Sequence, residues 1–220
     1  MSKPIQITEE HYKALCAAVE KKHGCKIVDK DDAVEMGILE SLFDKAREYA
    51  KLIGKENYVL SGGEWRDRYA VTLAERIYIP QHWSPLSKVL VLIHELQHAL
   101  QWQARQPQSD LPSDVSFAWL YLTWGDARVR FEVEAYRAGQ LEFCHFLTGN
   151  ITPLDRMAQP LEGSAYMLYG TEAGLTLARR LLGIAGTAVA SGVEPSTEAA
   201  RSAVAIVREL YPELEGSVAA

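Results

Sequence analysis

The segment VLVLIHELQHALQW, residues 89–102, constrains the fold of this 220-residue chain more than any other feature. It places His94 and His98 four residues apart, with Glu95 directly after the first histidine. On an α-helix, positions i and i+4 share one face, so both imidazoles can reach a single ion. The apolar run before His94 is typical of a buried helix. The segment therefore predicts a helical metal site. The alternative is a surface helix with solvated histidines.

The flanking residues predict where this helix begins and what Glu95 does on it. Ser84 and Pro85 are suited to the N-cap and the first helical position, so we expect a helix from there to about residue 103. Glu95 follows His94 by one residue, which is about 100° around the helix axis. It therefore borders the metal face without sharing it. That position suits a general base that holds a water molecule and does not ligate the ion.

Zinc in a catalytic site needs a third protein ligand and an open position for water. A third histidine at the spacing His-Glu-x-x-His-x-x-Gly-x-x-His is excluded, because position 101 is glutamine and position 104 is alanine. The best remaining donors are Glu132 and Glu134, in a helix that we expect over residues 127–148. The sequence thus predicts a glutamate as the third ligand.

The two glutamates are two residues apart, so a helix directs them to nearly opposite sides. Glu134 shares its expected face with small and apolar residues, including Ala127 and Ala138, where a carboxylate is costly to bury unless it is paired or metal-bound. Glu132 shares its side with Arg128, and we expect it to be the more exposed. We favour Glu134 as the ligand and keep Glu132 as the alternative. Without a metal, both glutamates would form only ion pairs with residues four positions away.

Composition narrows the classes of partner. The hydrophobic content of 48% is enough for a substantial core, and the net charge of −6 with scattered basic residues argues against a nucleic-acid partner. The most apolar stretch, residues 181–190, is too short to cross a bilayer, so we expect no membrane partner. Three cysteines at unrelated spacings do not form a disulfide framework. The N-terminal residues lack the pattern of a signal peptide. We therefore expect a cytoplasmic location.

The expected fold class is α+β, mostly helical with a small twisted sheet, in one domain over residues 1–220. Residues 1–56 are expected to form N-terminal helices, 57–148 the metal-site core and 149–220 a helical C-terminal part. β-Branched and aromatic runs predict the strands at residues 24–29, 57–60, 69–73 and 76–80. Pro80 closes the last run, which places that strand at the edge of the sheet.

The run HELQHALQWQ, followed some 35 residues later by a helical Glu-Ala-Tyr, resembles the zincin-like metallopeptidases whose third ligand is a glutamate, the gluzincins. In texture it is similar to small bacterial and phage metallopeptidases, over roughly residues 57–148. The resemblance implies Zn²⁺ bound by His94, His98 and Glu134, and Glu95 as the base. It also implies an edge strand beside the active site, for which residues 76–80 stand in the corresponding place. Where thermolysin-like members have an aspartate that orients a histidine, this chain has Ala138. Asp126 is a candidate replacement, or else the N-cap of its own helix.

The sequence therefore predicts a zinc-dependent hydrolase that cleaves peptide bonds in a peptide or protein substrate. Zinc would activate a water molecule, Glu95 would accept its proton, and the strand at 76–80 would hold an extended peptide by β-augmentation. The alternative is a non-catalytic interaction protein on the same scaffold, with structural or vestigial zinc. The intact Glu95 favours the enzyme.

Overall fold

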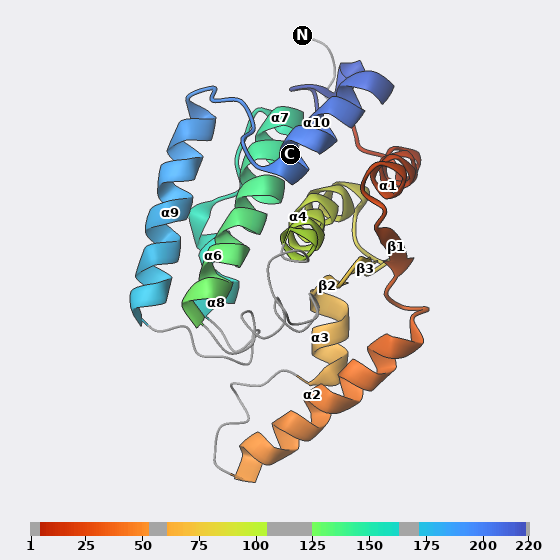
Figure 1. Ribbon diagram of the computed structural model, residues 1–220, viewed down its shortest axis with the longest axis vertical. Coiled ribbons are helices and arrows are strands. Elements are labelled where there is room, and N and C mark those ends of the chain that lie inside the picture. Colours follow the sequence, from red (N-terminus) through yellow and green to blue (C-terminus); the bar gives the residue numbers. More distant parts are fainter. Residues whose placement is uncertain (1–4, 53–60, 105–124, 163–171, 219–220) are drawn as a thin grey trace.

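The computed structural model describes residues 5–52, 61–104, 125–162 and 172–218 of the chain (Figure 1). These residues form a mostly helical structure with one small mixed sheet, in agreement with the expected α+β class. The helices and strands are, in order, α1 (Glu9–His23), β1 (Lys26–Asp29), α2 (Val34–Leu52), α3 (Gly62–Arg68), β2 (Val71–Leu73), β3 (Arg76–Ile79), α4 (Pro85–Gln103), α6 (Gly125–Tyr136), the π-helix η2 (Arg137–Phe143), α7 (Cys144–Thr148), α8 (Leu154–Glu162), α9 (Glu172–Ala190), α10 (Glu198–Leu210) and the 3₁₀ turn η4 (Pro212–Leu214).

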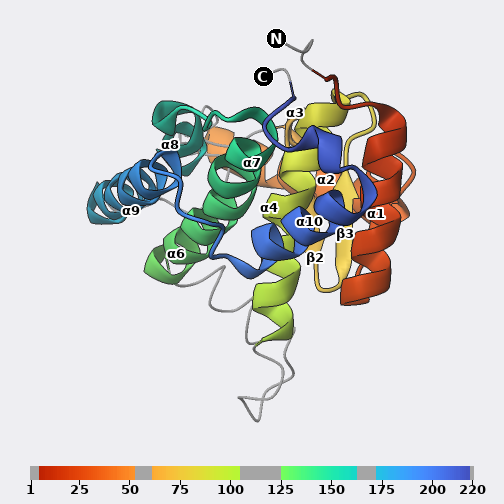
Figure 2. The ribbon, with the colours of Figure 1, turned by 90° about the horizontal axis from the view of Figure 1, so that it is seen from above.

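The helix α4 lies at the centre of the molecule and carries the histidine motif. Ser84 caps it by accepting a hydrogen bond from the backbone N–H of Ser87, and Pro85 is its first residue, as the sequence predicts. Helices α1 and α10, the segment from α6 to η2, and strands β2 and β3 all pack against it (Figure 2). Leu92, Ile93 and Leu96 have no exposed surface. This helix is therefore buried on all sides, which excludes the solvated surface helix.

The sheet has the strand order β1-β3-β2, with β3 parallel to β1 and antiparallel to β2. The prediction that residues 76–80 form an edge strand is therefore wrong. Pro80 follows the last paired residue, so its missing N–H costs the ladder nothing. Ile77, Tyr78 and Ile79 are all buried, which is typical of a strand covered on both faces. The outer strands of the described sheet are β1 and β2, and β2 also contacts α4.

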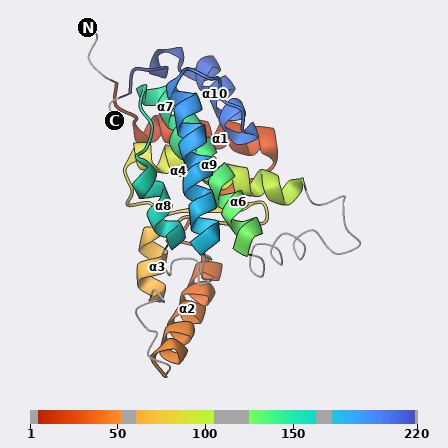
Figure 3. The same ribbon diagram turned by 90° about the vertical axis from the view of Figure 1, so that its left-hand side faces the viewer.

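The N-terminal part is organised around α1 and the pair α2 and α3. Thr8 caps α1 in a capping box with His11. The helix α2 packs against α3 and extends away from the rest of the molecule (Figures 1 and 3). The helix α3 is not among the elements predicted from the sequence. Ser61 in fact caps this helix together with Glu64. The predicted strand at 57–60 lies outside the described residues.

The run from α6 through η2 to α7 is one continuous helical segment, as predicted for residues 127–148, but its middle is a π-helix. A π-helical segment contains more residues per turn than an α-helix, so it shifts the phase of every residue beyond it. The helices α8 and α9 cover the outer side of this run (Figure 3). Among the described residues, none of the helices is long and apolar enough to cross a membrane.

Two glycines in helices make opposite predictions for stability. A Cβ atom on Gly139 would overlap the carbonyl oxygen of Leu90 and lie 3.0 Å from the backbone nitrogen of His94, so η2 meets α4 with no room for a side chain. We expect Gly139→Ala to lower the free energy of unfolding by about 1–3 kcal/mol, the usual cost of overpacking.

Gly37 is the matched control, because it is exposed in α2 and a Cβ there would meet nothing within 4 Å. Gly37→Ala should raise the free energy of unfolding by about 0.5–1 kcal/mol, since it removes backbone entropy from the unfolded chain. Urea unfolding followed by circular dichroism measures both variants. A Gly139→Ala variant as stable as the native chain would show that η2 and α4 can separate without cost.

Candidate metal centre

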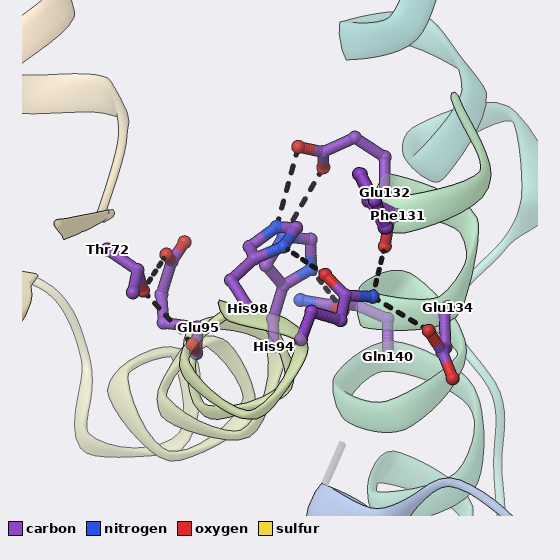
Figure 4. Close-up of polar contacts among 9 residues, drawn as sticks. Thr72, His94, Glu95, His98, Phe131, Glu132, Glu134 and Gln140 are labelled. Carbon is purple, nitrogen blue, oxygen red and sulfur yellow. Dashed lines mark hydrogen bonds and ion pairs between the residues drawn. The ribbon is translucent and has the colours of Figure 1, made fainter. Parts of the chain in front are cut away.

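His94 and His98 on α4 and Glu132 on α6 converge on one point (Figure 4). One ligand atom from each residue lies within 4.8 Å of the other two. Nε2 of His94 is 3.5 Å from Oε2 of Glu132, and Nε2 of His98 is 3.4 Å from Oε1. The three side chains are buried, and only 1% of the Glu132 surface is exposed. Two imidazoles and a carboxylate therefore share one enclosed site.

The spacing of these donors fits a bound ion better than a direct contact. Charge-assisted N–H···O bonds have heavy-atom distances of about 2.7–2.9 Å. Two ligands at about 2.0–2.1 Å from a tetrahedral zinc ion are about 3.4 Å apart. The observed distances of 3.4 and 3.5 Å agree with the second value. The residues present thus suit a divalent ion that accepts nitrogen and oxygen ligands, zinc among them.

The outer nitrogens of both histidines meet glutamine side chains. Nδ1 of His98 lies 2.9 Å from Oε1 of Gln101, and Nδ1 of His94 lies 3.4 Å from Oε1 of Gln140. An amide oxygen can only accept, so each Nδ1 carries a proton in these contacts and each Nε2 is the nitrogen that faces Glu132. These amides take the place that we left open for Asp126, whose side chain lies outside the described residues. Of these two glutamines, only Gln101 could have been inferred from the sequence, because it lies about one turn after His98 on the same helix.

The charges of His98 and Glu132 are strongly coupled. Burial favours the neutral imidazole of His98, but the charge of Glu132 and contact with it outweigh burial and raise the pKa of His98 to about 9. Burial likewise opposes ionisation of Glu132, yet the charge of His98 and contacts with both histidines hold the Glu132 pKa well below its ordinary value. Without an ion, the site therefore holds a protonated His98 against an ionised Glu132.

Glu95 is held apart from this cluster, on the side of α4 that faces the sheet (Figure 4). The hydroxyl of Thr72 on β2 lies 2.7 Å from Oε2 of Glu95 and 3.0 Å from its backbone carbonyl oxygen. Glu95 is 6% exposed and lies next to His94 in the chain. The structure thus gives Glu95 its own anchor, outside the group of residues that can hold a metal. Nothing in the sequence indicates Thr72.

Lys30 adds a buried positive charge on the same side. It follows β1, has no exposed surface, and donates to the carbonyl oxygens of Trp65 and Tyr69 at 3.2 and 2.6 Å. Burial lowers the pKa of Lys30 to about 8, and the negative charge of Glu95 partly opposes that shift. Lys30 also lies over the ring of Trp65. Its contacts join β1 to the end of α3.

The preference for Glu134 as the third ligand is corrected by the position of its side chain. Glu134 is exposed, whereas Glu132 is buried against the histidines. Oε2 of Glu134 accepts a hydrogen bond from Nε2 of Gln101 at 2.8 Å instead. The error arose because the predicted face combined Glu134 with Ala138, which lies beyond the start of the π-helix. The phase of an unbroken α-helix does not carry across that segment.

Two other histidines and a tyrosine lie outside the group of three possible ligands. His82 is exposed near the start of α4, and His145 is on α7, so neither joins the three ligand residues. The ring of Tyr136 packs edge-on against His94, with 4.6 Å between ring centres. Tyr136 therefore supports the position of a ligand side chain.

Comparisons with known proteins give no match. No known protein family fits the chain, and no curated protein or solved structure is significantly similar to it.

The coupled pair makes the uptake of a metal ion depend on pH. The folded pKa of His98, about 9, lies above the value of about 6.5 for an unfolded chain. The protonated form therefore stabilises the ion-free protein fully below about pH 6.5, and this contribution is lost as the pH rises through about 9. A divalent ion that binds Nε2 of His98 would have to displace that proton. We expect the apparent affinity for Zn²⁺ to rise between pH 6.5 and 9, with about one proton released per ion.

Calorimetric titration with Zn²⁺ in buffers of different ionisation enthalpy measures the released protons. A zinc affinity that is unchanged from pH 7 to 9 would contradict the protonated His98.

Proposed function

We propose that this chain is a zinc-dependent metallopeptidase of the zincin type, with His94, His98 and Glu132 as the zinc ligands and Glu95 as the general base. One observation carries the proposal: the two histidines of the motif direct their Nε2 atoms to one buried carboxylate, while the glutamate between them is anchored elsewhere. Three protein ligands, the number found among the described residues, leave the fourth position of a tetrahedral zinc ion for a water molecule. A purely structural zinc site has four protein ligands and needs no separate base.

The roles of the side chains follow from their contacts. When bound, zinc lowers the pKa of a coordinated water molecule and polarises the scissile carbonyl group. Glu95 accepts the proton of the attacking water and passes it to the leaving amine. The Thr72 hydroxyl holds the Glu95 carboxylate by Oε2, and within the described part of the chain no hydrogen bond engages Oε1, the oxygen that we assign to that proton. Glu132 would hold the ion together with the two histidines and would offset part of its charge.

The substrate would be an extended peptide beside β2. Within the described sheet, β2 is an edge strand, and its residue Thr72 touches Glu95. An edge strand offers unpaired N–H and C=O groups, to which a peptide backbone can add as a further strand. In this proposal residues 71–73 bind the peptide by β-augmentation, the role that was predicted for residues 76–80. We propose no nucleic-acid or membrane partner.

The ligand set predicts the metal content of three variants. We expect about one zinc ion per native chain, and none after the double substitution of His94 and His98 by alanine. Glu132→Gln should also lose zinc under dialysis, because it replaces an ionised ligand by a weak neutral one. His82→Ala is the control, since this exposed histidine lies outside the cluster. Elemental analysis of protein purified without chelators at pH 8 measures each case, and a metal-free native chain would remove the basis for the proposal.

Substitution of the proposed base, Glu95, should abolish peptide cleavage without loss of zinc. In Glu95→Gln the amide oxygen still accepts from Thr72, so folding and zinc content should stay as in the native chain. Its rate of peptide cleavage should fall by at least about 10²–10⁴-fold, because an amide cannot accept the proton of water. Both proteins are incubated with a broad mixture of unfolded peptides, and the products are identified by mass spectrometry.

Three outcomes of this comparison bear on the function. Cuts by the native chain alone support the peptidase. Cuts by both proteins at similar rates mean that a contaminant or another base is responsible. Zinc-loaded protein that leaves every peptide intact favours a non-catalytic role for the scaffold.

A further inference from the structure

A chain of hydrogen bonds connects the exposed Glu134 to the buried His98 through one glutamine. Gln101 on α4 is 8% exposed. Its Nε2 atom donates to Oε2 of Glu134 at 2.8 Å and to the carbonyl oxygen of Phe131 at 3.2 Å. Its Oε1 atom lies 2.9 Å from Nδ1 of His98. All the polar atoms of this amide therefore have partners.

The chemistry of these partners fixes which way the amide of Gln101 points. A backbone carbonyl can only accept a hydrogen bond, and so can a carboxylate. The end of the amide that faces Phe131 and Glu134 must therefore be the NH₂ group. The opposite orientation would place three oxygen atoms against one another. Two acceptors on α6 thus orient a side chain on α4.

The orientation of Gln101 in turn fixes the tautomer of His98. The amide oxygen facing Nδ1 can only accept, so Nδ1 keeps its proton, and it is Nε2 that offers a lone pair once an ion displaces its own proton. That nitrogen is 3.4 Å from Glu132. The corresponding contact of His94 with Gln140 is longer, at 3.4 Å against 2.9 Å. Of the two histidines, His98 therefore has the closer hydrogen-bond partner at its Nδ1 atom.

We propose that Glu134 is a positioning residue of the metal site, which acts through Gln101 to hold His98 in its metal-binding tautomer. The proposal rests on the proposed zinc site. It gives Glu134 a role outside the ligand set, because the carboxylate faces Gln101. Outer partners of metal-binding histidines commonly change metal affinity by about 10–100-fold. Glu134 is one residue further out, and the carbonyl of Phe131 remains when it is removed. Its effect is therefore smaller, about 3–10-fold.

A double-substitution cycle on zinc affinity tests this relay. The native chain, Glu134→Ala, Gln101→Ala and the double variant are titrated with Zn²⁺ against a chelating dye at fixed pH and ionic strength. We expect Glu134→Ala to weaken zinc binding about 3–10-fold in the native background and by less than about 2-fold when Gln101 is already alanine. Glu134→Gln keeps an acceptor oxygen and should retain most of the affinity. Asp155→Ala removes an exposed carboxylate from α8 and is the control for surface charge.

A second measurement reports the tautomer itself. In the zinc-loaded native chain labelled with ¹⁵N-histidine, we expect a slowly exchanging Nδ1–H signal of His98, assigned by its loss in His98→Ala. In Glu134→Ala that proton should exchange faster, and in Glu134→Gln it should be retained. If Gln101→Ala fails to fold, Gln101→Met serves in its place as a substitution of similar volume, and the single variants of the exposed Glu134 still decide the matter.

The outcomes separate this relay from the zinc site that it serves. An equal loss of affinity from Glu134→Ala in both backgrounds would mean that only its charge acts, and it would overturn the relay. An unchanged affinity in Glu134→Ala beside a native chain that binds zinc would overturn the relay and leave the zinc site intact. A native chain that binds no zinc would overturn both. A loss confined to the background with Gln101 supports the relay.

Discussion

The pairing of Glu132 with His94 and His98 is the interaction on which the interior of this protein depends. A carboxylate with 1% of its surface exposed is costly to bury unless opposite charge or a metal ion compensates it. The compensation comes from a different helix, so the pair fixes α6 against α4. Leucine and isoleucine side chains of α4 fill the surrounding core, but they do not specify the register of the two helices. The polar cluster adds that specificity, as buried polar groups do when all of them have partners.

The close approach of the helices follows from local backbone choices. Gly139 lets η2 contact the backbone of α4 at Leu90 and His94. The π-helix shifts the phase of the chain between α6 and α7, so buried residues on both sides of it still face the core. Glu142, in the same π-helix, accepts hydrogen bonds from the backbone and hydroxyl groups of Ser196 and Thr197, before α10. One irregular segment thus connects the site to the C-terminal helices.

The site has two sides that come from different parts of the fold. The helical side supplies Glu132 and the glutamines behind the histidines. The sheet side supplies Thr72, which anchors Glu95, and the buried Lys30. A general base works best when its carboxylate is held near the reacting water but outside the ligand set. Glu95 has its own anchor outside the group of residues that can hold a metal, and this separation from Glu132 supports the proposed division of roles between them.

The sequence by itself determined the α+β class, the start of α4 at Ser84 and Pro85, and the shared face of His94 and His98. Each of these depends on local chemistry, namely capping, hydrophobic periodicity and the 3.6-residue turn. The tertiary structure decided the rest. It put β3 at the centre of the sheet, because strand order depends on pairing between distant segments. It brought Glu132 rather than Glu134 to the histidines, because that choice depends on how α6 rotates against α4. Periodicity places two glutamates on opposite faces of a helix, but only the packing of a second helix decides which face is buried.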